Sequence, residues 1–196
     1  MELLDDVRHI IDEASFGSFY MGLSRLIASR PLLGTLVERW WDTTDSFHFS
    51  TTWEMTMTPF DCSMLIDIKM GGHPIPYDTD MGEWEAAQIY LLGIRPPISL
   101  LGMVRYSWFA NHYRGTAPAT REETEQYARG FLMFLFGTIL FADRANTVRL
   151  YLMSALMDLS RVRLYDQSGA SLDTLYGYMD STSSRSGHLI EGYWKA

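Results

Sequence analysis

Glu54 is the residue whose surroundings most invite a chemical interpretation. It lies inside an alternating stretch of β-forming residues, 47–57, and has apolar neighbours on both sides. A carboxylate is costly to bury without a partner. We therefore interpret Glu54 as a structural acid that holds a hairpin to a helix, as a cap or in a salt bridge with Arg39 or Arg105. A catalytic acid is the alternative.

Asp61 follows in a segment with the pattern of a helix start. Thr58 is a favoured N-cap residue, Pro59 suits the first helical position, and the acid comes three residues after the cap. This pattern predicts a helix over 58–68 with Asp61 at its beginning. In the enzymatic alternative, Asp61 would instead join Glu54 and a neighbouring histidine or arginine in a cleft.

The other reactive residue types lack the spacing that catalysis or metal binding requires. Cys62 is the only cysteine and has no adjacent base in the sequence, so we interpret it as a small buried side chain. The acids between 78 and 85 lack the ligand spacing of a calcium loop. The histidines, which also lack the paired spacing of zinc ligands, are His9, His48, His73, His112 and His188. The sequence predicts no catalytic residue set and no metal site.

The rest of the chain must position these side chains, and its most apolar stretch is 120–144. Thr120 and Glu123 have the spacing of a capping box, and residues 131–142 are apolar on nearly every helical face. A bilayer crossing requires roughly 20 apolar residues, and this run is shorter. We therefore predict a central buried helix. Arg129, at the polar end of the run, is a further candidate polar position, which we interpret as architectural.

Hydrophobic periodicity predicts more helices around this one, and alternation predicts a small β-hairpin that turns near Thr51. The predicted fold class is mainly α: a multi-helix globular domain with one small hairpin. We divide the chain into an N-terminal helical segment, 1–30, and a main part, 31–196, which form one globular unit. The expected helices, besides the central one, cover 3–14, 31–41, 58–68, 84–92, 99–114, 146–159 and 172–179.

Length and charge narrow the class of protein further. A chain of 196 residues is long enough to bury an ordinary core. Lysine and arginine number 16 against 24 acids, and this net charge of −8 disfavours a broad nucleic-acid-binding surface, which needs clustered cations. The acidic N-terminus lacks the basic start and apolar core of a signal peptide. We therefore expect an intracellular protein that is not secreted.

Six separated blocks of residues carry a resemblance to a known family. The blocks are F-H-F…W-E-M-T-M-T-P-F-D, G-G-H-P-I, a tryptophan helix ending in L-L-G, Y-S-W-F-A, Y-A-R-G-F-L-M-F-L-F-G-T-I-L-F-A-D and Y-L-M-S-A-L-M-D-L. In this order they resemble the plant mobile domain, an aminotransferase-like family of MAINTENANCE OF MERISTEMS-type and transposon-associated proteins. Glu54 and Asp61 match acids of the family pattern. Ile66-Asp67 replaces its usual Leu-Gly. The family pattern continues past Trp194, so we expect a chain truncated at its C-terminus.

The resemblance implies a non-catalytic protein-interaction module in a nuclear plant protein. Such a protein would be transposon-derived or related to nuclear factors for transposon silencing and meristem maintenance. The partner that the resemblance implies is a protein-phosphatase-7-like protein. It implies no association with membranes.

The description "aminotransferase-like" suggests pyridoxal phosphate chemistry, which requires a lysine for the Schiff base. The chain has only Lys69, before a Gly-Gly loop, and Lys195, its penultimate residue. We therefore predict no cofactor and no enzymatic activity. Two alternatives stay open: an uncharacterised enzyme that uses Glu54 and Asp61, and a transposon accessory protein that binds DNA through a basic stripe. The net charge makes direct nucleic-acid binding the weaker of the two.

Overall fold

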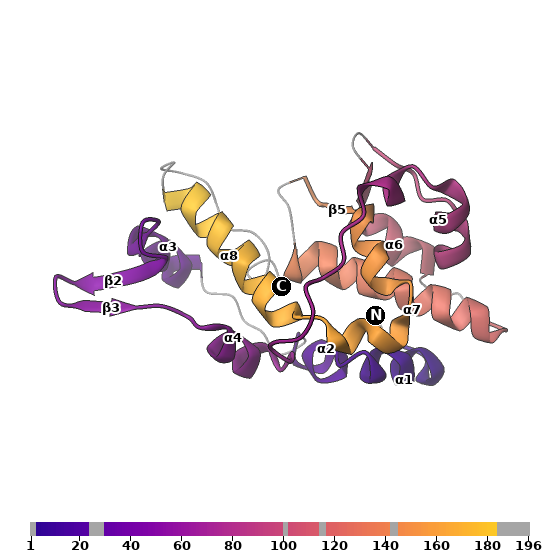
Figure 1. The fold of residues 1–196 in the computed structure, drawn as a ribbon, viewed down its shortest axis with the longest axis horizontal. Coiled ribbons are helices and arrows are strands. Elements are labelled where there is room, and N and C mark those ends of the chain that lie inside the picture. The colour runs from indigo at the N-terminus through magenta and orange to yellow at the C-terminus, as the bar shows by residue number, and fades with distance from the viewer. Residues whose placement is uncertain (1–2, 24–29, 100–101, 114–116, 142–144, 184–196) are drawn as a thin grey trace.

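Helix α7 runs through the larger body of the molecule, and other helices pack around it (Figure 1). The computed structural model describes residues 3–23, 30–99, 102–113, 117–141 and 145–183. Helix α7 (Arg121–Leu135) begins where the Thr120 side chain accepts a hydrogen bond from the Glu123 N–H, and it continues into the π-helical η3 (Phe136–Leu140). Nearly all its side chains from Tyr127 onward are buried, which confirms the expected central helix. Within the described part of the chain, no helix has both the length and the apolar character that crossing a membrane requires.

The helices that cover α7 come from distant parts of the sequence. Val7 and Ile11 of α1 are fully buried, as is Phe109 of α6. The expected helix over 84–92 is confirmed as α5, which ends at Gly93 in the left-handed conformation that glycine favours. The α-helices that pack on α7 are α1 (Asp5–Glu13), α5 (Glu85–Leu92) and α6 (Tyr106–Tyr113); α2 (Gly17–Leu23) contacts α1, and η1 (Thr79–Gly82) contacts α5.

Two segments that were expected to be helical begin as strands. Val104 of β4 pairs with Val148 of β5 in a two-stranded antiparallel sheet, and both valines are fully buried. Branched side chains suit a strand, but their spacing also fits a helix, and the pairing partner lies in a remote segment. The predictions of helices starting at 99 and 146 were therefore wrong over these residues. The elements are β4 (Met103–Arg105), β5 (Thr147–Arg149), and the 3₁₀ helices η4 (Leu150–Leu156) and η5 (Leu159–Leu164).

A smaller arm extends from this body and consists of a three-stranded antiparallel sheet and helices α3, α4 (Pro59–Ile66) and α8 (Figure 1). The predicted hairpin over 47–57 is confirmed as β2 and β3, with β1 added as the third strand. Helix α8 is longer than the predicted 172–179. The elements are α3 (Arg30–Glu38), β1 (Trp40–Trp41), β2 (Ser46–Ser50), β3 (Trp53–Met55) and α8 (Gln167–Ser183).

Trp40 corrects the prediction of a helix over 31–41. Helix α3 ends at Glu38, and Trp40 pairs with Phe47 in the sheet. Its ring is buried in a small second core against α8, where the indole N–H donates to Asp180 at 2.7 Å. Trp41, which was expected at the end of that helix, points to the opposite face of the sheet and is 55% exposed.

Helix α4 (Pro59–Ile66) connects the hairpin to the larger body. Its predicted start is confirmed, because the Thr58 side chain accepts from the Asp61 N–H and the Asp61 carboxylate accepts from the Thr58 N–H at 2.9 Å. The helix ends slightly before the predicted residue 68, at a left-handed Asp67. The fold class, mainly α with a small antiparallel sheet, is as predicted. The sequence also predicts a further apolar segment from His188 onward, and that segment lies outside the described residues.

Candidate functional site

Glu54 lies on the exposed face of the hairpin, and its partners belong to the same sheet. Its carboxylate accepts a hydrogen bond of 2.5 Å from the Ser46 hydroxyl and lies 3.5 Å from Nε2 of His48. The bond from Ser46, together with His48, lowers the pKa of Glu54 below its ordinary value, although desolvation opposes this shift. The side chain is about half exposed. The expected partners, Arg39 or Arg105, are not those that the structure shows.

Ser46, His48 and Glu54 carry the residue types of a hydrolase triad but not its geometry. In a triad the serine and the acid bind different nitrogens of the histidine ring. Here the Ser46 hydroxyl lies 3.1 Å from Nε2, the same nitrogen that faces Glu54, and it donates its proton to the carboxylate. Trp41 stacks on the His48 ring with a centroid separation of 4.3 Å. This cluster braces the hairpin rather than activating a nucleophile.

Asp61 and Cys62 both lie in the first turn of α4, where Asp61 takes part in the capping box and Cys62 is buried. Hydrogen bonds from the Thr58 hydroxyl and then its N–H lower the pKa of Asp61, as expected for a capping acid. Burial raises the pKa of the Cys62 thiol, which disfavours the nucleophilic thiolate. In the described part of the chain, no hydrogen bond or ion pair connects Asp61 to Glu54.

Arg129 is a buried anchor between α7 and the segment after η4. Its Nε donates to the carbonyl of Leu156 at 2.9 Å, and a terminal nitrogen lies 3.3 Å from the Glu125 carboxylate. The guanidinium therefore satisfies carbonyls at the end of a 3₁₀ helix that would otherwise lack donors. The three candidate polar positions, Glu54, Asp61 and Arg129, thus lie in three separate local environments.

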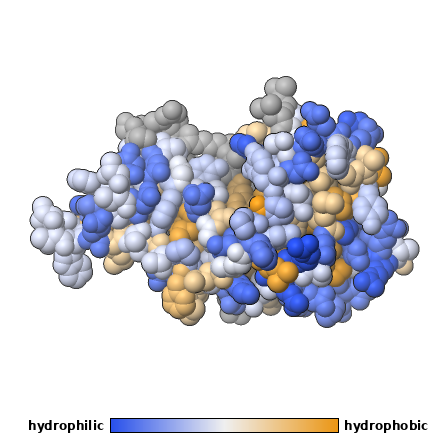
Figure 2. Space-filling view, viewed as in Figure 1, coloured by the Kyte–Doolittle hydropathy of each residue, from blue (hydrophilic) through white to orange (hydrophobic). Residues whose placement is uncertain are grey.

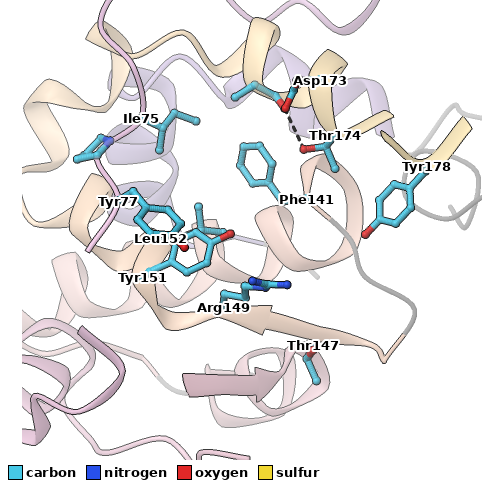
Figure 3. Close-up of a pocket in the computed structure, with 12 residues that line it drawn as sticks. Ile75, Tyr77, Phe141, Thr147, Arg149, Tyr151, Leu152, Asp173, Thr174 and Tyr178 are labelled. Atoms are coloured by element: carbon cyan, nitrogen blue, oxygen red, sulfur yellow. Dashed lines mark hydrogen bonds between the residues drawn. The ribbon is translucent and has the colours of Figure 1, made fainter. Parts of the chain in front are cut away.

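A cavity of about 430 Å³ lies between α8, the β5–η4 segment and residues 75–77 (Figure 3). Tyr77 and Tyr151 form one wall with ring centroids 4.3 Å apart, and the Arg149 guanidinium lies over the Tyr151 ring. Asp173 and Thr174 of α8 line the other side. None of the candidate positions is among the described residues that line this cavity. Sequence reasoning missed it because its walls come from three remote segments.

No set of three metal-binding side chains gathers among the residues that the structure describes. Lys69 is exposed beside an open depression near Asp12 and Asp67, and Lys195 lies outside the described residues. The exposed lysine has neighbouring carboxylates, whereas a cofactor phosphate needs donors and positive charge.

The most distinctive surface of the arm is apolar. We call it the β3–α4 surface and define it by five exposed side chains: Trp53 (71%), Met55 (58%), Phe60 (58%), Met64 (69%) and Leu65 (72%). Figure 2 shows hydrophobic residues at the lower edge of the view, over α4. A hint in the sequence was the composition of α4, which is apolar on more faces than one buried side requires.

Comparison with known proteins identifies relatives over most of the chain. Residues 16–195 match the plant mobile domain. Protein MAIN-LIKE 2 of Arabidopsis thaliana is 29% identical over 93% of this chain, and Protein MAINTENANCE OF MERISTEMS of the same plant is 28% identical over 93%. A serine/threonine-protein phosphatase 7 long form homolog, also from Arabidopsis thaliana, is 30% identical over 82%. The chain spans only 28%, 39% and 12% of the length of these three relatives. No solved structure gives a significant match.

Proposed function

Because this chain belongs to the plant mobile domain family, we propose that it is a non-catalytic protein-interaction module that binds its partner through the β3–α4 surface. The family is linked to meristem maintenance through the relatives that match this chain. The observation that carries the proposal is the exposure of five large apolar side chains on one arm. Such patches mark sites where proteins bind one another.

The arm holds this surface in place before any partner arrives. Trp40 is fixed to Asp180 of α8, and the Tyr176 hydroxyl of α8 donates to the Met57 carbonyl between β3 and α4. A surface that is already ordered loses little conformational entropy on binding. Trp53 stands at its outer end, and tryptophan is enriched among the residues that dominate binding energy.

The geometry around the candidate acids supports a non-catalytic function. Glu54 accepts a hydrogen bond from the Ser46 hydroxyl, and Asp61 caps a helix, so each carboxylate has a structural partner. An acid–base pair would need the two groups to approach one substrate atom. Neither acid lines the described cavity beside Tyr151.

The proposed setting is a plant nucleus, where the protein is transposon-derived or related to factors for transposon silencing and meristem maintenance. The proposed partner is a protein-phosphatase-7-like protein. Its support is the relative named as a serine/threonine-protein phosphatase 7 long form homolog, in which a stretch similar to this chain occupies 12% of the length. A domain that accompanies a class of protein within one chain is a reasonable candidate to bind that class in separate chains.

Calorimetry with purified components tests this function. The chain is titrated with a purified phosphatase-7-type protein, with Met64→Asp as the test variant and Met157→Asp as the matched control, since both methionines are more than half exposed. We expect Met64→Asp to weaken binding about tenfold or more and Met157→Asp to leave it unchanged, because only Met64 lies on the β3–α4 surface. No binding by the unaltered chain, or equal loss in both variants, would overturn the proposal.

A further inference from the structure

Strand β3 is an edge of the sheet, and the two edges of this sheet differ. The strand order is β1-β2-β3. The β1 edge is covered by α8, to which Trp40 donates a hydrogen bond. Among the described residues, β3 pairs only with β2, and all three of its residues are exposed. An exposed edge presents backbone N–H and C=O groups that can pair with another extended chain.

The two faces of β3 present different chemistry to such a chain. Side chains alternate along a strand, so Trp53 and Met55 point to one face and Glu54 to the other. Met55 is paired with Phe47 on the apolar face, and Glu54 is paired with His48 on the polar face. An added strand would therefore meet apolar side chains on one face and a carboxylate on the other.

The segment of the chain that contains this edge is mostly acidic. All the charged side chains of residues 38–61 are exposed, and Arg39 is the only arginine or lysine in that stretch. The acids are Glu38, Asp42, Asp45, Glu54 and Asp61. The bond from Ser46 favours the ionised form of Glu54. A positively charged partner is attracted to such a surface, and an acidic one is repelled.

The same carboxylate disfavours pairing between two copies of this chain. An antiparallel pairing that overlaps all three residues of β3 with its own copy places Glu54 directly opposite Glu54. Like charges directly opposite one another destabilise an antiparallel pair. An inward or edge charge of this kind is a known means of preventing edge-to-edge association. In this register Glu54 therefore disfavours a second copy and favours a basic strand.

We propose that β3 binds an extended, basic segment of a partner protein by strand addition, with alternating apolar and Lys/Arg side chains. The apolar side chains of that segment contact Trp53 and Met55, and its cations face Glu54 and the neighbouring acids. The segment continues toward Phe60 on α4, where the β3–α4 surface extends. This inference rests on the proposed function and specifies the chemistry of the partner segment.

A synthetic peptide of alternating valine and lysine tests the proposal on the full chain by fluorescence anisotropy. A second peptide carries the same side chains but is N-methylated at every backbone amide, so it cannot donate ladder hydrogen bonds from either edge. A third has glutamate in place of lysine. We expect the first peptide to bind and each of the others to bind about tenfold or more weakly.

Two protein variants locate the site. Glu54→Lys reverses the charge on β3, and Glu83→Lys makes the same change at an exposed acid after η1. Binding should fall about tenfold in the first and less than about twofold in the second. The peptide comparison uses the unaltered chain, so it remains decisive if Glu54→Lys disturbs the hairpin.

Equal binding of the methylated peptide would overturn strand addition. A concentration-dependent dimer that the neutral variant Glu54→Gln strengthens would show a second copy as the occupant. If the phosphatase-type protein binds in calorimetry but the lysine peptide does not, this inference fails and the proposed function stands. If neither binds, both fail.

Discussion

The body around α7 and the arm around β3 and α4 use the same kinds of side chain in opposite ways. Phe136 of the body is fully buried and contacts Phe16 and Phe141, whereas Phe60 of the arm is 58% exposed. The body gains free energy by removing its apolar residues from water. The arm leaves comparable residues in water while its backbone is held by caps and hydrogen bonds. The body therefore supplies most of the stability of the fold, and the arm leaves apolar area exposed to water.

Truncating one phenylalanine in each region gives the largest expected contrast. Phe136→Ala should lower the free energy of unfolding by about 4 kcal/mol, because it removes a buried ring and leaves a cavity. Phe60→Ala should change it by less than about 0.5 kcal/mol, because the ring is mostly exposed. Denaturant unfolding measures both. Comparable losses in the two variants would contradict the division between body and arm.

Arg129, a polar residue, provides a second comparison between a buried and an exposed side chain. Arg129→Met should cost about 2 kcal/mol, because the Leu156 carbonyl loses its donor in a buried site. Arg121→Met is the control, since Arg121 pairs with the same Glu125 but its side chain is 93% exposed. Its loss should stay below about 0.5 kcal/mol. Thermal unfolding that ranks the two variants equally would exclude the anchoring function of Arg129.

Local signals in the sequence located the elements that depend on neighbouring residues. The capping pair of Thr58 and Asp61 gave the start of α4, and Gly93 gave the end of α5. These predictions succeeded because the hydrogen bonds or backbone conformation involved lie within a few residues.

Elements set by remote contacts escaped local reasoning. Val148 fits a helix by spacing but pairs with Val104 of a distant segment, and Trp40 leaves helix α3 for the sheet because α8 buries it. For Glu54, the sequence indicated a structural acid but not that Ser46 would be its main partner. The exposure of α4 could not be predicted either, although its apolar composition was a hint. An apolar helix is interpreted as buried unless the elements that surround it are known.

Acidification should increase local opening of the arm at a higher pH than in the body. Among the stability effects predicted here, this one is the smallest. The pKa values of Glu54 and Asp61 are lowered by hydrogen bonds in the fold. Their stabilising contribution is therefore present above the ordinary values, 4.5 and 3.8, and is lost as the pH falls through the lower folded values. Amide exchange in residues 46–55 should accelerate on acidification, while α7 amides stay protected.

Glu54→Gln separates the structural from the catalytic interpretation of this acid. The variant should weaken the Ser46 bond and reduce the pH dependence of hairpin exchange, because the amide does not ionise. Its thermal midpoint should fall slightly. A turnover that disappears in Glu54→Gln while hairpin exchange and thermal midpoint remain unchanged would favour the enzymatic alternative.

The most direct test of the binding account is hydrogen exchange of the chain with and without a phosphatase-7-type protein. We expect slower exchange in the complex at residues 53–65, which include the β3–α4 surface, and unchanged exchange in α7 and beside the Tyr77–Tyr151 cavity wall. Protection confined to the cavity, or none in residues 53–65, would contradict the claim that this chain binds proteins through its arm.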